Sequence, residues 1–424
     1  MTAATTDAVA TSTAVQKDVS WRTPIALGVF ALLSILLLVV FARDGDSTFS
    51  FAQDGAVRIP DVRFPVRGTG IVVSAAAVLL ALVAALQVRL RGRAQRWVVV
   101  VLTLLLVVGF LVWATAGQRL PVIGLLTGSL ALAAPLIFGA LGGVVSESVG
   151  VVNIAIEGQL LAGSFVSAVL ASVTHNLFVG LVGAVVAGML VSFVLGALAI
   201  KYVVNQVIVG VVLNVLVLGL TTFLYQSVLI PSTDTLNQPP TFSNVAIPGL
   251  SAFPVVGAVL FDQSVVTYLM IIAVIVVWIG LTRTRWGLRV RAVGEHPQAA
   301  DTVGINVNRT RFWNVTLAGA IAGLGGAYFT LGSVGSFSQN ITSGAGYIAL
   351  AAVIFGRWDP LRASAAGLLF GFASQVANIL GIVGSPVPSD ILLTLPYVVT
   401  IIAVAGLVGR VRGPAAAGRP YIKG

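Results

Sequence analysis

The chain has 424 residues, of which 58% are hydrophobic and only 9% are charged, and its mean hydropathy is +1.03. Soluble domains carry about 25% charged residues, so this composition excludes a soluble protein with a single anchor and indicates a polytopic membrane protein. The net charge of +10 does not point to nucleic acid, because the basic residues lie in short segments beside apolar runs, and the absence of cysteine excludes disulfides and cysteine-ligated metals.

The apolar runs predict the fold class. They are continuous, about 18–24 residues long and without the alternation of a β-barrel strand, so we expect an all-α polytopic membrane protein. It would be a bundle of about twelve transmembrane helices, with ten or eleven as the alternative. Residues 1–23, rich in Thr and Ala without apolar periodicity, are expected to form a disordered cytoplasmic tail. The predicted spans are 24–42, 70–88, 97–116, 123–145, 157–174, 178–200, 206–228, 265–282, 313–333, 345–356, 363–383 and 390–408.

Two of these spans are weak, 123–145 and 345–356. The second is too short to cross a membrane unless it borrows flanking residues, or unless it is a half-helix packed inside protein.

The distribution of Lys and Arg predicts the orientation. With both termini in the cytoplasm, the cytoplasmic segments hold 19 of the 24 basic residues and the extracytoplasmic segments hold five. This is the positive-inside pattern, and it requires an even number of spans. Residues 409–424 are therefore expected to form a basic cytoplasmic tail.

Two extracytoplasmic loops are long. Loop 43–69 contains four acidic residues and four arginines, and it is expected to form either a small ordered cap or a solvated link. Loop 229–264 is rich in Pro, Ser, Thr and Asn and has no basic residue. It is a candidate contact for an external partner, with a plain connecting loop as an equal alternative.

Glycines recur at the spacing at which helices pack in lipid: Gly139 with Gly143, Gly319 with Gly323, and Gly367 with Gly371. Such pairs let two helix backbones approach closely. We expect them to lie at helix–helix contacts and assign them no function beyond packing.

The cytoplasmic segment 283–312 carries six arginines and two acidic residues between two apolar spans. Its centre, from Glu295 to Ile305, predicts a short helix with Pro297 in the first turn and Gly304 closing it. Because a short helix moves as a rigid unit, this segment is a candidate docking site for a protein that drives the membrane part. The alternative is an amphipathic stretch on anionic lipid headgroups, which the arginines at 283, 285, 289 and 291 also suit.

Asn153 and Glu157 lie four residues apart and would share one face of a helix. Polar side chains inside a membrane-spanning region are unfavourable unless they are paired or face water, so both residues are candidates for the substrate pathway. Glu157 also stands where a span begins, where a carboxylate stabilises the helix N-terminus. Capping and substrate contact stay open as equal alternatives for this residue.

Asn214, Gln375 and Asn378 lie deepest in their predicted spans, and we favour them as further candidates for a pathway that admits a neutral polar solute. For each one alone, a hydrogen bond between helices is the commoner role. No cofactor or metal is expected, because the two histidines, His175 and His296, have no second ligand at metal spacing.

The chain lacks an energy source of its own. ATP hydrolysis would need the phosphate-binding loop G-x-x-x-x-G-K-[S/T], and none of the three lysines, Lys17, Lys201 and Lys423, stands in such a context. Membrane-embedded acids, which ion-driven carriers usually display, are nearly absent. We therefore expect a non-enzymatic transport subunit whose ATPase is a separate chain.

Three segments carry a family resemblance. The run GLRVRAVGEHPQAADTVGIN, followed by NRTRFWNVTLAGAIAGLGGAYF, resembles the coupling loop of ATP-binding-cassette (ABC) importer permeases, in the branch of ribose, nucleoside and branched-chain amino acid permeases. The segments 146–165 (SESVGVVNIAIEGQLLAGSF) and 343–363 (SGAGYIALAAVIFGRWDPLRA) resemble the nucleoside type of that branch. The sequence His296-Pro297-Gln298 departs from a strict Glu-Ala-Ala start. The coupling-loop residues are Glu295, Ala299, Ala300 and Gly304, in the pattern E-x-x-x-A-A-x-x-x-G, together with Arg289 and Arg291.

The resemblance covers about residues 124–408. It implies a permease core over 123–408 in the cell membrane and an addition of transmembrane helices over 24–122. It also implies three partners: an ABC ATPase, a second homologous permease, and an extracytoplasmic substrate-binding lipoprotein. Nucleosides are the favoured substrates. The alternatives are simple sugars of the ribose or galactose type, or a stand-alone secondary carrier.

Overall fold

The computed structural model describes residues 21–51, 59–92, 94–402 and 412–422. Most of the predicted tail 1–23, and residues 409–411 and 423–424 of the predicted C-terminal tail, lie outside these ranges. The chain divides into two compact units, residues 1–50 with 61–120 and residues 51–60 with 121–424, and each is described by itself.

The first unit is a three-helix bundle. Helix α1 (Arg22–Ile35) continues as a π-helix, η1 (Leu36–Val40), and is followed by α2 (Val66–Arg91) and α3 (Arg96–Ala114). Many leucines and valines of these helices are exposed, as expected for helices that face lipid. The centre of the bundle is filled by Leu27, Ala31, Ala77, Ala84, Val98 and Leu102.

A small sheet closes one end of this bundle. Strands β1 (Asp46–Ser50), β2 (Val62–Pro65) and β3 (Arg119–Pro121) lie in the order β2-β1-β3, and β1 pairs antiparallel with β2. Two of these strands come from loop 43–69. The described part of loop 43–69 therefore forms the small ordered cap that was one of its two predicted forms. Residues 52–58 of the loop lie outside the described ranges.

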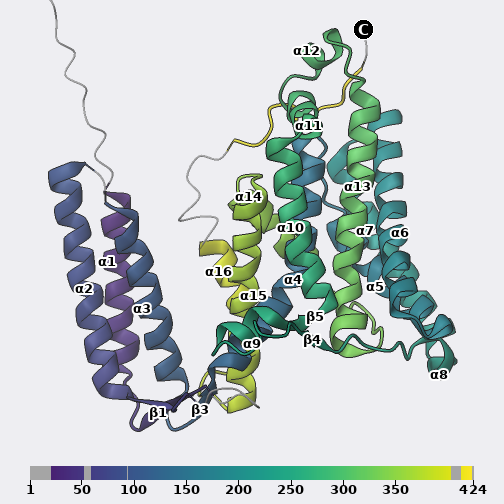
Figure 1. Cartoon of the computed structure of the whole chain (residues 1–424). Helices are drawn as coiled ribbons and strands as arrows, with labels where there is room; N and C mark the ends of the chain where they lie inside the picture. Colours follow the sequence, from purple (N-terminus) through teal and green to yellow (C-terminus); the bar gives the residue numbers. More distant parts are fainter. Residues whose placement is uncertain (1–20, 52–58, 93, 403–411, 423–424) are drawn as a thin grey trace, which may run out of the picture. The chain divides into compact units, whose positions relative to one another are not determined.

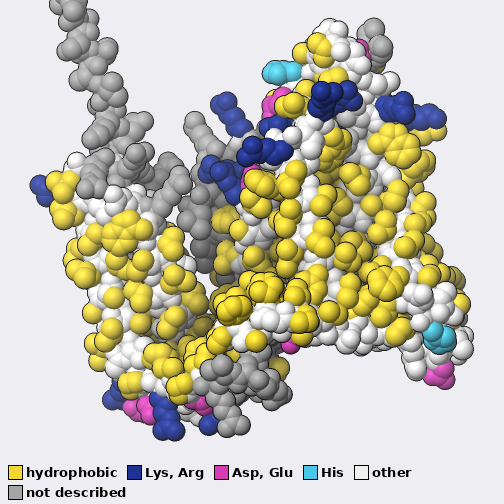
Figure 2. Space-filling model, viewed as in Figure 1, with side chains coloured by type: hydrophobic (Ala, Val, Ile, Leu, Met, Phe, Trp, Pro, Cys, Tyr) yellow, Lys and Arg dark blue, Asp and Glu magenta, His cyan; other side chains and the backbone are white. Residues whose placement is uncertain are grey.

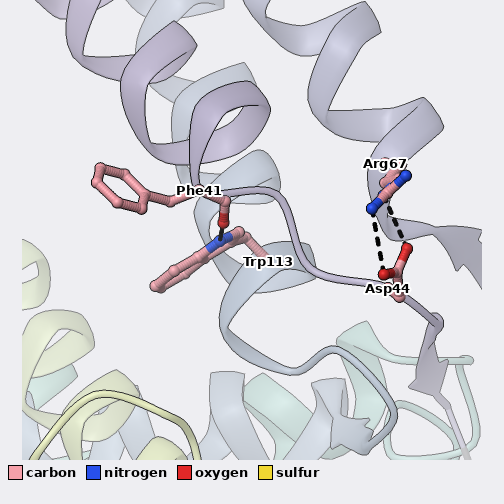
Figure 3. A network of polar contacts seen from close by, with 4 residues as sticks. All are labelled: Phe41, Asp44, Arg67 and Trp113. Carbon is pink, nitrogen blue, oxygen red and sulfur yellow. Dashed lines mark hydrogen bonds and ion pairs between the residues drawn. The ribbon is translucent and has the colours of Figure 1, made fainter.

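Polar contacts fix this cap to the helices (Figure 3). At the start of α2, Arg67 Nε lies 2.7 Å from Asp44 Oδ1, and at the end of α3, Trp113 Nε1 donates to the Phe41 carbonyl oxygen at 2.8 Å. The ion pair is exposed and adds little stability by itself. The ion pair and the Trp113 hydrogen bond matter more for geometry. Together they fix the end of η1, the start of α2 and the end of α3 to the segment from Phe41 to Asp44.

The second unit contains the remaining elements. Its long helices are α4 (Val122–Ser148), α5 (Ile156–Thr174), α6 (Leu177–Gly196), α7 (Gln206–Leu224), α10 (Val265–Arg283), α13 (Val307–Ala327) and α15 (Pro360–Val383). Helices α6, α7 and α13 continue as the π-helical turns η2 (Ala197–Lys201), η3 (Tyr225–Leu229) and η4 (Tyr328–Val334). The shorter elements are α8 (Thr233–Leu236), β4 (Asn244–Ala246), α9 (Val256–Phe261), β5 (Asp262–Ser264), α11 (Arg285–Glu295), α12 (Pro297–Thr302), α14 (Ala345–Phe355) and α16 (Ser389–Ile402).

Within the described residues, ten helices are long and apolar enough to cross a membrane. They coincide with ten of the twelve predicted spans and agree with the lower predicted count. The predicted span 345–356 is α14, whose 11 residues extend about 16 Å, roughly half of the ~30 Å hydrocarbon core. The predicted span 390–408 is α16, which is described only to Ile402. The fold class is the predicted one, a helical polytopic membrane protein.

Helix α4 lies at the centre of the second unit. Every residue from Ala133 to Ser148 is buried, and the helix packs against α13, α14 and α15. The predicted packing role of the glycine pairs is confirmed. An added Cβ would approach a neighbouring helix to 2.8 Å or less at each of Gly139, Gly143, Gly319, Gly323, Gly367 and Gly371. Side chains larger than glycine would therefore force these helices apart.

The two ends of the second unit differ in composition. In Figure 1, α11, α12 and the C-terminal segment lie at one end, and α8, α9, β4 and β5 lie at the other. In Figure 2, the visible Lys and Arg side chains of this unit gather at the α11–α12 end, above a broad hydrophobic band. This agrees with the predicted orientation, in which segment 283–312 is cytoplasmic and loop 229–264 is extracytoplasmic.

Candidate functional site

Two short helices, α11 and α12, form most of the cytoplasmic segment 283–312. Helix α11 ends before His296, and Pro297 is the first residue of α12. Gly304 has a φ of +85° and its N–H donates to the Asp301 carbonyl oxygen at 2.9 Å, which ends the helix. The predicted short helix with Pro297 at its start and Gly304 at its end is confirmed. The separate helix α11 in front of it was not predicted.

The segment presents an exposed face at this end of the second unit. Val303 is 75% exposed, an apolar side chain with no protein cover. Ala300 is buried and anchors α12 in the core. The five other predicted coupling residues are exposed: Arg289, Arg291, Glu295, Ala299 and Gly304.

Helix α11 is seated on the ends of α4 and α13. A Cβ at Gly294 would collide with the Ser148 carbonyl oxygen at the end of α4. The Trp286 Nε1 donates to Asn314 Oδ1 of α13 at 2.9 Å. Through these two contacts α11 is joined directly to both membrane helices.

The loop 149–155 leads from this seat to the start of α5. The Ser146 hydroxyl donates to the Val151 carbonyl oxygen, and the Val152 N–H donates to Gln206 Oε1 of α7, each at 2.8 Å. Five of the seven loop residues are buried. Non-helical backbone within a membrane protein is stable only where protein or water satisfies its polar groups, and these bonds do so here.

Glu157 stands in the first turn of α5 and accepts hydrogen bonds from the start of α14. Its Oε1 accepts from the Thr342 hydroxyl at 2.5 Å and from the Gly344 N–H at 2.9 Å, and its Oε2 accepts from the Gly346 N–H at 2.6 Å. The carboxylate thus lies at the N-termini of two helices, which both favour negative charge. In this structure both oxygens are occupied by capping, and the bonded residues Thr342, Gly344 and Gly346 lie 185 to 189 residues further along the chain.

Asn214 and Asn153 complete the start of α5. Asn214 of α7 accepts the Gly158 N–H at Oδ1 and donates to the Ile154 carbonyl oxygen through Nδ2, each at 2.8 Å. Asn153 pairs with Gln159 through two amide hydrogen bonds of 3.1 and 3.0 Å. The structure therefore brings together three of the five predicted pathway residues, Asn153, Glu157 and Asn214, with their polar atoms bonded to protein.

A pocket of about 190 Å³ adjoins this capping site. Its walls come from the middle of α4, η4, the first turn of α14, and α15 and α16. Thr342 belongs both to the pocket wall and to the capping site of Glu157. The polar and aromatic side chains of the wall are Thr342, Ser343, Ser374, Asn378, Phe329 and Tyr397.

The loop in front of α14 is strained. Ser343 has a φ of +45°, in the left-handed region that non-glycine residues other than Asn and Asp rarely adopt. Backbone strain of this kind gathers at binding and switch sites, where surrounding contacts hold it. Its position beside the pocket supports a functional assignment for the pocket.

The other two predicted pathway residues lie on α15. Asn378 is exposed and lines the pocket. Gln375 Nε2 donates to the Gly124 carbonyl oxygen of α4 at 3.3 Å and is not part of the pocket wall.

Two residues of the site, Thr342 and Tyr397, were not predicted from the sequence. The possibility that 345–356 is a half-helix could have indicated the residues around Thr342. The first N–H groups of such a helix lie inside the membrane and require an acceptor, such as Glu157.

Residues 125–416 match the family described as "Branched-chain amino acid transport system / permease component". The guanosine ABC transporter permease protein NupQ of Bacillus subtilis is 41% identical over 315 residues, 70% of this chain and 95% of the relative. The nucleoside ABC transporter permease protein NupC of Lactococcus lactis is 38% identical over 299 residues, 68% and 93% of the two chains. The putative glucose ABC transporter permease protein TsgC13 of Haloferax volcanii is 34% identical over 296 residues, 66% and 89%. No solved structure matches the chain.

The ten apolar helices among the described residues, together with the transporter permeases to which the chain is similar, define a multi-pass transport protein of the cell membrane, with a transport role and not an enzymatic one. The chain belongs to the branched-chain amino acid transport system / permease component family, in agreement with the sequence resemblance. The family match begins at residue 125, so α1, α2 and α3 lie outside it.

We expect Glu157→Gln to loosen the start of α14. The amide keeps the shape of the side chain but replaces one accepting oxygen by a donor, which leaves a buried donor unpaired at a cost of about 1–3 kcal/mol. Hydrogen exchange of the purified protein, read by mass spectrometry, should rise about tenfold at the amides of residues 344–348. Asp234→Asn, at an exposed site in the outer loop, is the control and should leave that exchange unchanged. Equal exchange in the Glu157 variant and the wild type would contradict the capping role.

Proposed function

We propose that this chain is the permease subunit of an ABC importer that carries nucleosides across the cytoplasmic membrane by alternating access. The observation that carries the proposal is the helix pair α11–α12, exposed to the cytoplasm and seated on the ends of α4 and α13. A transporter with a docking surface and no phosphate-binding loop needs its energy from another chain. The relatives named above are permease proteins of ABC transporters, which supports the same class.

The first partner in this proposal is a separate ABC ATPase. It would dock on α12 and the end of α11, where an acidic side chain at Glu295 and an apolar one at Val303 are both exposed. An interface needs such an apolar centre with charged surroundings. The family resemblance adds a second, homologous permease subunit and an extracytoplasmic substrate-binding lipoprotein. The outer segment with α8, β4, α9 and β5 is the surface we assign to that lipoprotein.

The movement we propose runs through contacts already described. Closure of the ATPase would push α12 and α11, and α11 would displace the end of α4 and the loop 149–155. That loop leads directly to Glu157, whose carboxylate holds the start of α14. Helix α14 and its preceding loop form one wall of the pocket, so the pocket would open to alternate sides of the membrane.

The pocket suits a nucleoside. The base presents a flat apolar face, for which Phe329 and Tyr397 are available, and the ribose hydroxyls need donors and acceptors such as Asn378 and Ser374. In this proposal the ATPase supplies the energy, so no coupled proton or sodium ion is required. The names of the guanosine and nucleoside permeases among the relatives support this substrate class.

A simple sugar is the second candidate. It has the same need for hydroxyl and amide partners, and one relative is named a putative glucose permease. A stand-alone carrier is the third candidate, and it would move solute without any partner.

For the domain organisation we propose a permease core over 123–408 and an added membrane unit over 24–122, because the family match starts at residue 125.

The docking assignment predicts the effect of Gly304→Val. Valine at a φ of +85° costs about 1–2 kcal/mol, distorts the end of α12 and adds a branched side chain to the docking face. The ATPase recovered with the tagged permease from its native membranes should fall about fivefold. Glu295→Lys, which reverses an exposed charge on the same face, should act in the same direction.

The matched control is Gly249→Val in the outer loop. Gly249 has a φ of +80° and open space around it, as Gly304 has, so both variants impose the same local strain. Only the cytoplasmic variant should lose the ATPase. Normal recovery of the ATPase with Gly304→Val and Glu295→Lys would show that another surface docks it.

The substrate assignment predicts the outcome of competition. In a deletion strain expressing the importer, unlabelled adenosine and guanosine at excess should abolish uptake of labelled nucleoside, whereas ribose and glucose should not compete. Competition by the sugars alone would establish the second candidate and refute the first. Transport by the purified chain reconstituted without partners would establish the stand-alone carrier.

A further inference from the structure

The C-terminal segment 412–422 crosses the helices that we propose as the ATPase docking site (Figure 1). The Ala416 N–H donates to the Gly294 carbonyl oxygen of α11 at 2.9 Å, and the Ala415 N–H donates to Glu295 Oε2 at 3.3 Å. Ala416 is 5% exposed, so the segment is packed onto α11 and does not merely lie near it.

The same segment also binds the loop on which α11 sits. The Gly418 N–H donates to the Gly150 carbonyl oxygen at 3.2 Å. The C-terminal segment therefore joins α11 to the loop 149–155, because Ala416 bonds to α11 and Gly418 bonds to the loop. These bonds act in addition to the direct packing of Gly294 on Ser148.

A buried arginine depends on this segment. Arg311, in the first turns of α13, is 2% exposed, and its guanidinium donates to the Val149 carbonyl oxygen at 3.0 Å and to the Arg419 carbonyl oxygen at 2.8 Å. Its Nη2 has no partner among the described residues. A buried guanidinium with so few acceptors is unfavourable, and loss of the tail would remove one of them.

Two aromatic side chains complete the attachment. Trp358, whose Nε1 donates to Glu147 Oε2 of α4 at 2.5 Å, lies against Gly413, where an added Cβ would come within 2.9 Å of the indole ring. The Tyr421 hydroxyl lies close to Asp301 of α12. Desolvation, and secondly Asp301, raise the pKa of the Tyr421 hydroxyl above its ordinary value.

We infer that residues 413–421 form a cytoplasmic brace, which holds α11 and α12 on the loop 149–155 in the orientation that receives the ATPase. The brace is hydrogen-bonded to α11, to the loop beneath it and to Arg311 of α13, and its Tyr421 lies close to Asp301 of α12. Its residues position the docking site and are not themselves required to touch the ATPase. The inference rests on the proposed function.

The test uses Ala416→Gln in the full chain. Glutamine does not fit the buried site of Ala416, so the brace should detach. Hydrogen exchange at the amides of 290–304 should rise about tenfold in the purified permease, while exchange in α5 and α6 stays unchanged. The affinity for the ATPase purified from the same complex should fall about fivefold. Ile422→Gln is the control, because Ile422 is 74% exposed and lies beyond these contacts, and both values should stay at wild-type level.

Unchanged exchange at 290–304, or unchanged affinity for the ATPase, would overturn the inference. If Ala416→Gln does not give folded protein, Tyr421→Phe removes only the hydroxyl near Asp301 and should raise exchange at 297–304 at least about twofold; no rise in exchange would overturn the inference equally. The result for Gly304→Val separates the two proposals. If Gly304→Val weakens ATPase binding and Ala416→Gln does not, the brace is wrong and the docking site stands. If neither weakens it, the docking site is wrong as well.

Discussion

One carboxylate holds together the two helices on which the second unit depends. Glu157 is almost fully buried, and a buried charge is stable only where protein groups replace its water. Two N–H groups and one hydroxyl from the start of α14 do so, and the N-terminus of its own helix contributes its dipole. The need is mutual. Helix α14 is too short to cross the membrane, so its first N–H groups would lack acceptors inside the protein without this side chain.

This arrangement places a rigid contact between the cytoplasmic face and the pocket. Helix α11 rests on Ser148, the loop 149–155 follows from there, and Glu157 holds Thr342, which is part of the pocket wall. Each step is a direct contact, and the loop is held by hydrogen bonds from α4 and α7. A contiguous set of contacts does not by itself establish energetic coupling, which requires that both sites bias the same element. Helix α14 lines the pocket directly and is joined through Glu157 to the segment that follows the loop under α11.

Local features of the chain were readable from the sequence. Apolar runs of sufficient length predicted the membrane spans, and Pro297 and Gly304 predicted the two ends of α12. The spacing of the glycines predicted the tight contacts between helices. The sites were harder, because their partners are remote in sequence. Nothing near Glu157 indicates Gly346, and nothing near Gly294 indicates Ala416. Polarity alone also does not separate pathway residues from structural ones. Asn214 and Asn378 both lie deep in apolar helices, yet one caps α5 and the other lines the pocket.

The central claim is that movement of α11 and α12 reaches the pocket inside the membrane. The chain has no cysteine, so Ser374→Cys would place a single thiol of this subunit in the pocket wall. In the reconstituted importer, the rate at which a small water-soluble thiol reagent modifies that cysteine should change about fivefold or more when ATP is added. Equal rates with and without ATP, in a complex that hydrolyses ATP, would contradict the claim.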